Sequence, residues 1–167
     1  MMADPQRAQK ISAEKGIGNL SVYDLTPGDA RQLEDLVEET ESDIVIIDQI
    51  RNMNALNTAA KDITRRMDQA AQEFRAMLKR QDVLGISIAQ AYAGEHGKKV
   101  VWYGPDDIDS SRVGLAASGD LVIGIGADEN MLEQDRRALS IGKNKLGDTK
   151  KGIITHFDLR HSKVKAI

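Results

Sequence analysis

Two apolar runs in this sequence end on polar side chains, one of a kind that can hold a metal ion and one of a kind that can hydrogen-bond a phosphate. Residues 44–47 read IVII and are followed by Asp48, and residues 83–89 read VLGISIA and are followed by Gln90. A carboxylate in that place can hold a Mg²⁺ ion, directly or through water, as in a Walker B element. An amide on a neighbouring strand can hydrogen-bond a γ-phosphate. Plainer explanations stay open, with Asp48 as the cap of the next helix and Gln90 as a polar residue entering a loop.

A lysine-rich stretch near the C-terminus carries a second kind of chemistry. The segment KNKLGDTKKG at 143–152 contains Lys143, Lys145, Lys150 and Lys151 and has the Gly, Asp and Thr of a hairpin connection. A cation on such a hairpin can reach across a subunit boundary to a neighbour's nucleotide, in the manner of an arginine finger. The alternative is an ordinary solvated turn.

The segment YAGEHGKKVVWYGP at 92–105 combines basic and aromatic residues. It includes Lys98, Lys99, Trp102 and Tyr103, of which Trp102 is the only tryptophan in the chain. Lysines can pair with phosphates and rings can stack on bases, so this composition suits single-stranded nucleic acid. The alternative is that Trp102 and Tyr103 pack beneath the loop against the core.

Composition limits the class of protein. The chain has 167 residues, enough for one domain with a core, and a net charge of −3. This charge excludes a polycation that binds nucleic acid by bulk charge, so such binding needs a local patch. The sequence has no cysteine, which excludes disulfides and cysteine-based zinc sites and fits a cytoplasmic location. It also lacks a run of about 20 apolar residues, so we expect no contact with membrane.

Apolar periodicity and turn residues predict the elements that position these side chains. Strands are expected at 20–25, 43–48, 83–90, 121–127, 138–144 and 152–158, and helices at 3–15, 29–40 and 53–77, with a long loop at 91–105 and a short helix within 106–118.

Strands that alternate with helices predict an α/β fold with a mostly parallel sheet and flanking helices. The final hairpin is expected to add an antiparallel edge to that sheet. The apolar runs ending at Asp48 and Gln90 are expected to be buried on both faces. Ligands of open parallel sheets bind beyond the carboxyl ends of the strands, which is where Asp48 and Gln90 are expected.

In this order, the features resemble the C-terminal half of the RecA-type ATPase domain of DnaB-type replicative hexameric DNA helicases, phage helicases included. The resemblance extends from about residue 20 to residue 158. It implies that Asp48 is the Walker B aspartate and a metal ligand, that Gln90 senses the γ-phosphate, and that 92–105 contact DNA. The cofactors it implies are ATP and Mg²⁺, and the whole of 1–167 would be a partial RecA-like ATPase domain.

The resemblance has two departures. The sequence contains no G-x-x-x-x-G-K-[ST] motif, so the first strand and the P-loop helix are expected to be absent and to come from an upstream half or another chain. The family's K-x-R-x-G finger motif matches Lys143, Lys145 and Gly147, but its arginine position holds Lys145. Lysine lacks the bidentate fork of arginine, so both Lys145 and Lys143 are finger candidates.

Three hypotheses follow for the function. The first is part of an ATP-dependent replicative DNA helicase that works as a homo-oligomeric ring on single-stranded DNA. The second is a RecA- or KaiC-like ATPase with a recombination or regulatory role. The third is a degenerate, non-enzymatic module for DNA binding or oligomerisation, which the missing P-loop favours.

Overall fold

The computed structural model describes residues 19–25, 27–56, 62–91, 100–108, 114–149 and 152–167. The helices are α2 (Ala30–Thr40), η2 (Ile50–Asn52), α3 (Ile63–Gln81), η4 (Pro105–Asp107), α4 (Gly114–Ser118) and α5 (Glu129–Glu133), and the strands are β1 (Ile44–Asp48), β2 (Leu84–Ile88), β3 (Leu121–Gly126), β4 (Arg136–Asn144), β5 (Gly152–Asp158) and β6 (Lys163–Ala166).

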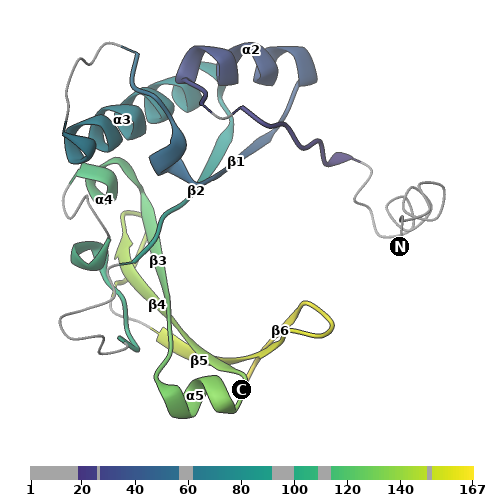
Figure 1. Cartoon of the computed structure of the whole chain (residues 1–167), viewed down its shortest axis with the longest axis vertical. Helices are drawn as coiled ribbons and strands as arrows, with labels where there is room; N and C mark the ends of the chain where they lie inside the picture. Colours follow the sequence, from purple (N-terminus) through teal and green to yellow (C-terminus); the bar gives the residue numbers. More distant parts are fainter. Residues whose placement is uncertain (1–18, 26, 57–61, 92–99, 109–113, 150–151) are drawn as a thin grey trace.

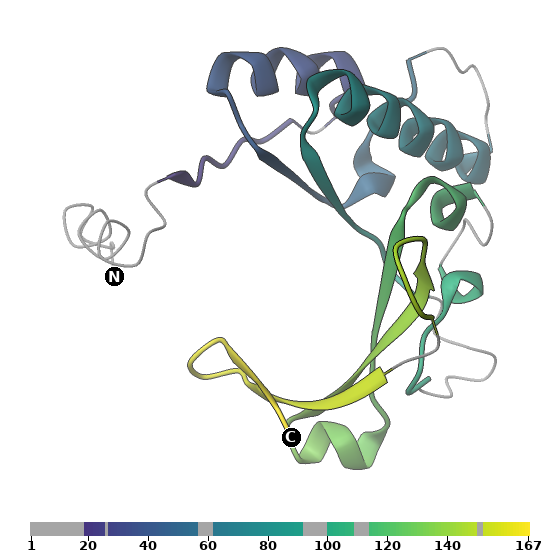
Figure 2. The same cartoon turned by 180° about the vertical axis from the view of Figure 1, so that it is seen from behind.

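The strands form two separate sheets (Figures 1 and 2). β1 and β2 make a parallel pair in which Ile44 lies opposite Leu84 and Asp48 opposite Ile88. β3, β4, β5 and β6 follow in that order in an antiparallel sheet. The mixed α/β fold and the antiparallel β4–β5 hairpin are confirmed. The expectation of one mostly parallel sheet is wrong for the described residues, because β3 pairs antiparallel with β4 and has no ladder with β2.

Helices α2 and α3 cover one face of the β1–β2 pair (Figure 1). Asp29 caps α2 by accepting the backbone N–H groups of Arg31 and Gln32, and Asp62 caps α3 through the N–H of Thr64. The hydrophobic core of the molecule lies beneath α2 and α3. It consists of Val37, Val45, Ile50, Met67, Ala71, Phe74, Met77 and Leu115.

Two expected elements differ from the structure, and a third lies outside the described residues. Residues 20–25 form no strand, because their local alternation finds no partner strand among the described residues. The long helix begins at Ile63 rather than Met53, since Met53 is extended and forms a bridge to Gly28. The helix expected at 3–15 lies outside the described residues.

The opposite face of the β1–β2 pair is apolar and exposed, which corrects the expectation that both faces are buried. Val45 is 7% exposed on the helix side, whereas its neighbour Ile46 is 57% exposed on the other side. The β3 strand repeats this alternation. The half-exposed apolar side chains are Ile44, Ile46, Leu84, Ile86 and Ile88 on the first sheet and Leu121, Ile123, Ile125 and Ile153 on the second.

The second sheet carries a strap on the face opposite its exposed apolar side chains. Side chains at Gly124 and Gly126 would collide with the backbone of Tyr103 and Val101, so these glycines allow residues 100–105 to lie directly on β3. Ser140 of β4 donates to the carbonyl of Tyr103 at 2.5 Å. The strap therefore covers one face of this sheet and leaves the other bare. None of the described helices is long and apolar enough to cross a membrane.

Candidate active site

Asp48 and Gln90 lie at the same edge of the parallel pair. Asp48 is the last residue of β1 and lies opposite Ile88, the last residue of β2, and Gln90 follows two residues later. Neighbouring strands are about 4.8 Å apart, so the two residues lie where two adjacent strands end. Both residues are exposed. The geometry therefore places a carboxylate and an amide at the edge where ligands of parallel sheets bind.

The Asp48 carboxylate has no hydrogen bond or ion pair within the described part of the chain, and it caps no helix there. The short helix η2 has Gln49 at its N-cap and no side-chain cap bond, and α3 is capped by Asp62. The structure thus removes the capping explanation for Asp48 among these residues. A carboxylate with free oxygens at a strand end suits Mg²⁺, which binds one or two protein carboxylates and fills its other positions with water and phosphate oxygens.

Gln90 has a partner that the sequence did not indicate. The guanidinium of Arg51 donates from Nη1 to Oε1 of Gln90 at 3.0 Å. This hydrogen bond links the segment after β1 to the segment after β2. Because Oε1 accepts this bond, the NH₂ group of Gln90 is left to donate to another acceptor. The only feature of the sequence that could have indicated this contact is a basic residue, Arg51, three positions after Asp48.

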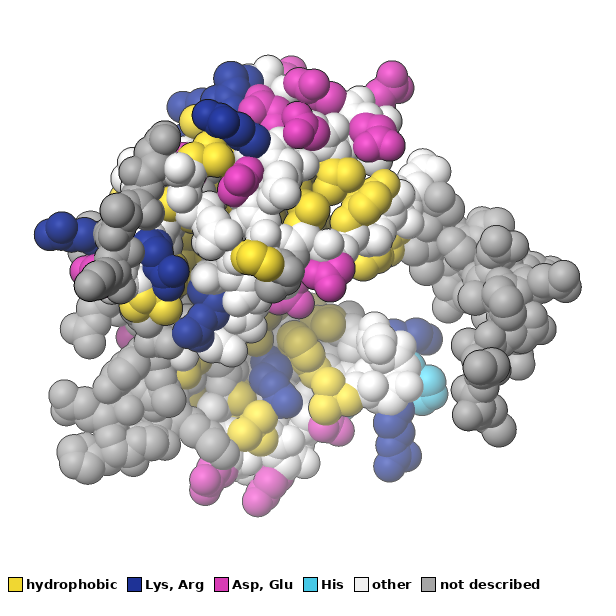
Figure 3. Space-filling view, turned by 45° about the horizontal axis from the view of Figure 1, so that its top comes forward, with side chains coloured by type: hydrophobic (Ala, Val, Ile, Leu, Met, Phe, Trp, Pro, Cys, Tyr) yellow, Lys and Arg dark blue, Asp and Glu magenta, His cyan; other side chains and the backbone are white. Residues whose placement is uncertain are grey.

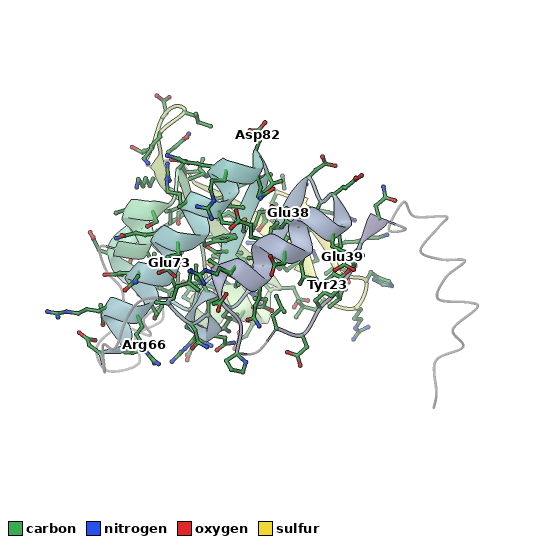
Figure 4. The ribbon with its side chains drawn as sticks, turned by 90° about the horizontal axis from the view of Figure 1, so that it is seen from above. Tyr23, Glu38, Glu39, Arg66, Glu73 and Asp82 are labelled. Carbon is green, nitrogen blue, oxygen red and sulfur yellow. The ribbon has the colours of Figure 1, made fainter. Side chains whose placement is uncertain are left out.

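Buried contacts hold the segment after Asp48 in place. Ile50 is 1% exposed and anchors η2 in the core. Further along, the backbone N–H of Asn54 donates to the carbonyl of Gly28 at 2.8 Å, and that of Leu56 to the Glu73 carboxylate at 2.9 Å. Figure 4 shows Glu73 on α3, seen from above. These contacts therefore hold the end of β1 and the segment after it, with Asp48 and Arg51, against α3.

Lys143 is engaged inside the chain. Its ammonium donates to the carbonyls of Ala116 at 2.7 Å and Ala117 at 3.1 Å, at the C-terminal end of α4. Burial, and then repulsion by Lys145, lowers the pKa of Lys143 from its ordinary value. In this position Lys143 satisfies helix-end carbonyls that have no partner within the helix.

Lys145 belongs to a cluster centred on Asp120. Its ammonium lies 2.8 Å from Oδ1 of Asp120, and Arg75 of α3 donates from Nη2 to the same oxygen at 2.8 Å. Hydrogen bonds from Lys145 and then from Arg75 lower the pKa of Asp120 to about 2. The lysine and the carboxylate are about half exposed, with side-chain exposures of 45% and 54%.

The predicted site residues thus fall into two groups. Asp48 and Gln90 come together with Arg51 at the edge of the first sheet, while Lys143 and Lys145 sit with Asp120 beside the second sheet. No hydrogen bond or ion pair joins the two groups within the described ranges. Sequence reasoning missed Arg51, Arg75 and Asp120 as members of these groups.

The proposed DNA-contacting segment is described only from residue 100, so Lys98 and Lys99 lie outside the described residues. Trp102 is 50% exposed, and a side chain at Gly152 would collide with its ring, so one side of the indole packs on β5. Tyr103 is partly buried in the strap. The described residues contain no group of three or more His, Cys, Asp or Glu side chains that could hold a metal ion without other ligands.

Two solved structures share the fold of this chain. A DnaB-like replicative helicase, solved in a study of its interactions with primase, matches with a TM-score of 0.76 and 15% identity over 99% of this chain. A second solved structure, described as an ATPase domain, matches with a TM-score of 0.77 and 14% identity, also over 99% of this chain. This chain spans 42% of the first structure's chain and 62% of the second's. No family model matches this chain, and no curated protein matches it in sequence.

Proposed function

We propose that residues 1–167 are the C-terminal part of a RecA-like ATPase domain that works in an ATP-dependent DNA helicase. The observation that carries this proposal is the carboxylate of Asp48, which lies near Gln90 at the carboxyl edge of the β1–β2 pair and has no hydrogen-bond or ion-pair partner among the described residues. The fold shared with a replicative helicase and with a separate ATPase domain supports it.

In this proposal Asp48 would hold the Mg²⁺ ion of a bound ATP, which would supply positive charge next to the phosphates. The amide of Gln90, held by Arg51, donates to the terminal phosphate and changes partner when that phosphate leaves. A lysine from the 143–145 stretch of a neighbouring subunit approaches the same phosphate, which requires a homo-oligomeric ring. Residues 92–105, including Lys98, Lys99, Trp102 and Tyr103, contact single-stranded DNA and respond to the nucleotide through Gln90.

The proposed site needs a P-loop partner, by which we mean a polypeptide that carries the G-x-x-x-x-G-K-[ST] strand–helix unit of a RecA-type domain. The 167 residues contain no such motif. The exposed apolar side chains on the two sheets support a covering segment, because large exposed apolar patches on proteins mark interaction surfaces. Figure 3 shows hydrophobic side chains on both sides of the gap between the upper and lower parts of the molecule. We propose that the P-loop partner packs there.

Lysine substitutions on these faces test this packing. The double variant Ile46→Lys with Ile123→Lys places two charges where the P-loop partner would bury apolar area. Each buried isoleucine contributes roughly 1.5–3 kcal/mol, so we expect at least about a tenfold rise in the Kd for the P-loop partner. The measurement is calorimetric titration of the partner into the chain.

The matched control is Leu159→Lys, because Leu159 is 65% exposed beyond β5 and belongs to neither face. It should leave the affinity unchanged. Equal affinity of the double variant and the wild type would place the partner elsewhere.

The function itself is tested by mixing the chain with a P-loop partner and measuring ATP hydrolysis with and without single-stranded DNA. We expect hydrolysis only in the mixture, stimulation by DNA, and weaker stimulation at higher salt because phosphate contacts release counterions. A mixture that binds DNA but never binds or hydrolyses ATP would support the non-enzymatic alternative instead.

A further inference from the structure

One face of the second sheet carries a line of basic side chains that the proposed site does not use. Arg136 of β4 lies opposite His156 of β5, and His156 lies opposite Lys165 of β6. Residues directly opposite each other in neighbouring strands share a face of the sheet, so these three form one line across it, which we call the cation row. Lys163 precedes Lys165 by two residues and therefore adds a fourth basic group to the same face.

The positive charge of this face is not neutralised by the described residues. Neither the cation row nor Lys163 makes a side-chain hydrogen bond or ion pair there. The carboxylate of Asp158 lies opposite Lys163, but it is held by His161, whose Nδ1 lies 2.9 Å from Oδ2. Residues 152–167 contain three Lys or Arg and one Asp, a net charge of +2 in a chain whose net charge is −3. Because like charges side by side on a sheet are unfavourable, an anion bound here would stabilise the hairpin.

The length of the cation row fits a chain of anions better than a single one. Figure 3 shows Lys, Arg and His side chains gathered at the lower right, where the β5–β6 hairpin lies in Figure 1. The row crosses three strands spaced about 4.8 Å apart, so its ends are about 10 Å from each other. A single phosphate cannot contact both ends of such a row, whereas successive phosphates of a nucleic acid can.

Trp102 supplies an aromatic ring on the same face. A side chain at Gly152 would collide with this ring, and Gly152 and His156 belong to the same face of β5 because four residues separate them. At about 3.3 Å per residue, Gly152 lies about 13 Å along β5 from the cation row. The indole is 50% exposed. An exposed ring beside cations suits the unstacked bases of a single strand, whereas an acidic peptide has no base to stack on it.

We infer that the cation row and Trp102 form a binding surface for single-stranded nucleic acid, with phosphates on the row and a base on the indole. The cations of this surface belong to β4, β5 and β6 and lie outside the segment 92–105. The inference goes beyond the proposed function, because binding here needs no nucleotide, no P-loop partner and no ring. It shares only Trp102 with the proposed function.

Binding of a fluorescent oligothymidylate of about 12 nucleotides to the chain alone tests this surface. Lys163→Gln with Lys165→Gln should raise the Kd roughly tenfold at low salt and lower the slope of log K against log salt by about 1.4, because each phosphate contact on a single strand contributes about 0.7. Lys163→Arg with Lys165→Arg should bind as the wild type does. Binding should also quench the fluorescence of Trp102, the only tryptophan in the chain, through base stacking.

The matched control is Arg66→Gln with Lys79→Gln, which removes the same charge from exposed positions on α3, where Figure 4 labels Arg66. It should leave the Kd and the salt slope unchanged. Equal losses in the two double variants would reduce the effect to net charge and overturn the inference. Polyglutamate that displaces the oligonucleotide at equal charge concentration would also overturn it, in favour of an acidic protein segment. An assembly that fails to hydrolyse ATP would overturn the proposed function but not this surface, which is measured without nucleotide.

Discussion

Asp48→Asn is expected to lower ATP hydrolysis by the assembled protein by roughly 10²-fold or more, the largest effect on activity that we expect from a single substitution. The substitution keeps the shape of the side chain and replaces one carboxylate oxygen by an amide nitrogen. An amide carries no charge to hold Mg²⁺, and the described residues hold no cluster of acidic side chains that could take over the ion. The measurement is kcat with saturating Mg²⁺ and ATP.

The matched control is Asp43→Asn. Asp43 precedes β1 at the opposite end of the same strand, is exposed, and differs from Asp48 mainly in position. It loses the same charge far from the carboxyl edge, so hydrolysis should change little. Equal losses in the two variants would mean that net charge matters and that Asp48 is not a metal ligand.

Met77→Ala is expected to destabilise the chain by about 2–5 kcal/mol, the largest effect on stability. Met77 is fully buried on α3, in the core that also contains Val45 of β1 and Ile50 of η2. Alanine would leave a cavity beneath the strand that carries Asp48. The measurement is the free energy of unfolding from urea denaturation of the isolated chain.

Met131→Ala provides the comparison, because Met131 lies on the short helix α5 and is only partly buried. Its loss should cost much less than the loss of Met77. If both variants lost the same free energy, the core beneath β1 would not be the main source of stability in this part of the fold.

The sequence allowed the positions of Asp48 and Gln90 to be predicted because strand ends are a local feature. An apolar run followed by a polar residue defines where a strand stops, and parallel pairing then brings the two ends to one edge. The exposure of Ile46 and Ile86 could not be predicted in the same way. An apolar run looks the same whether its second face is covered by its own chain or by another.

Contacts between distant segments account for the residues that were missed. Arg51 reaches Gln90 across 39 positions, and Arg75 reaches Asp120 across 45. These pairs depend on strand register and on how α3 packs against α4, and periodicity reports neither. The alternation at 20–25 predicted a strand for a related reason, since a strand needs a partner edge that the local pattern does not supply.

The lysine-rich stretch at 143–152 shows what composition can predict and what it cannot. Its composition predicted a hairpin connection, and β4 and β5 form one. Composition could not distinguish the roles of Lys143 and Lys145, because the two lysines differ only in their contacts. Lys143 donates to carbonyls at the end of α4, and Lys145 pairs with the exposed carboxylate of Asp120.

Paramagnetic broadening by Mn²⁺ bound with a non-hydrolysable ATP analogue tests most directly whether Asp48 and Gln90 share one triphosphate. In the chain assembled with a P-loop partner, NMR signals of the Asp48 carboxyl and the Gln90 amide should both broaden when Mn²⁺ replaces Mg²⁺, while that of Asp43 stays sharp. Broadening at Asp43 or elsewhere, with Asp48 and Gln90 unaffected, would contradict a nucleotide site at the carboxyl edge of the β1–β2 pair.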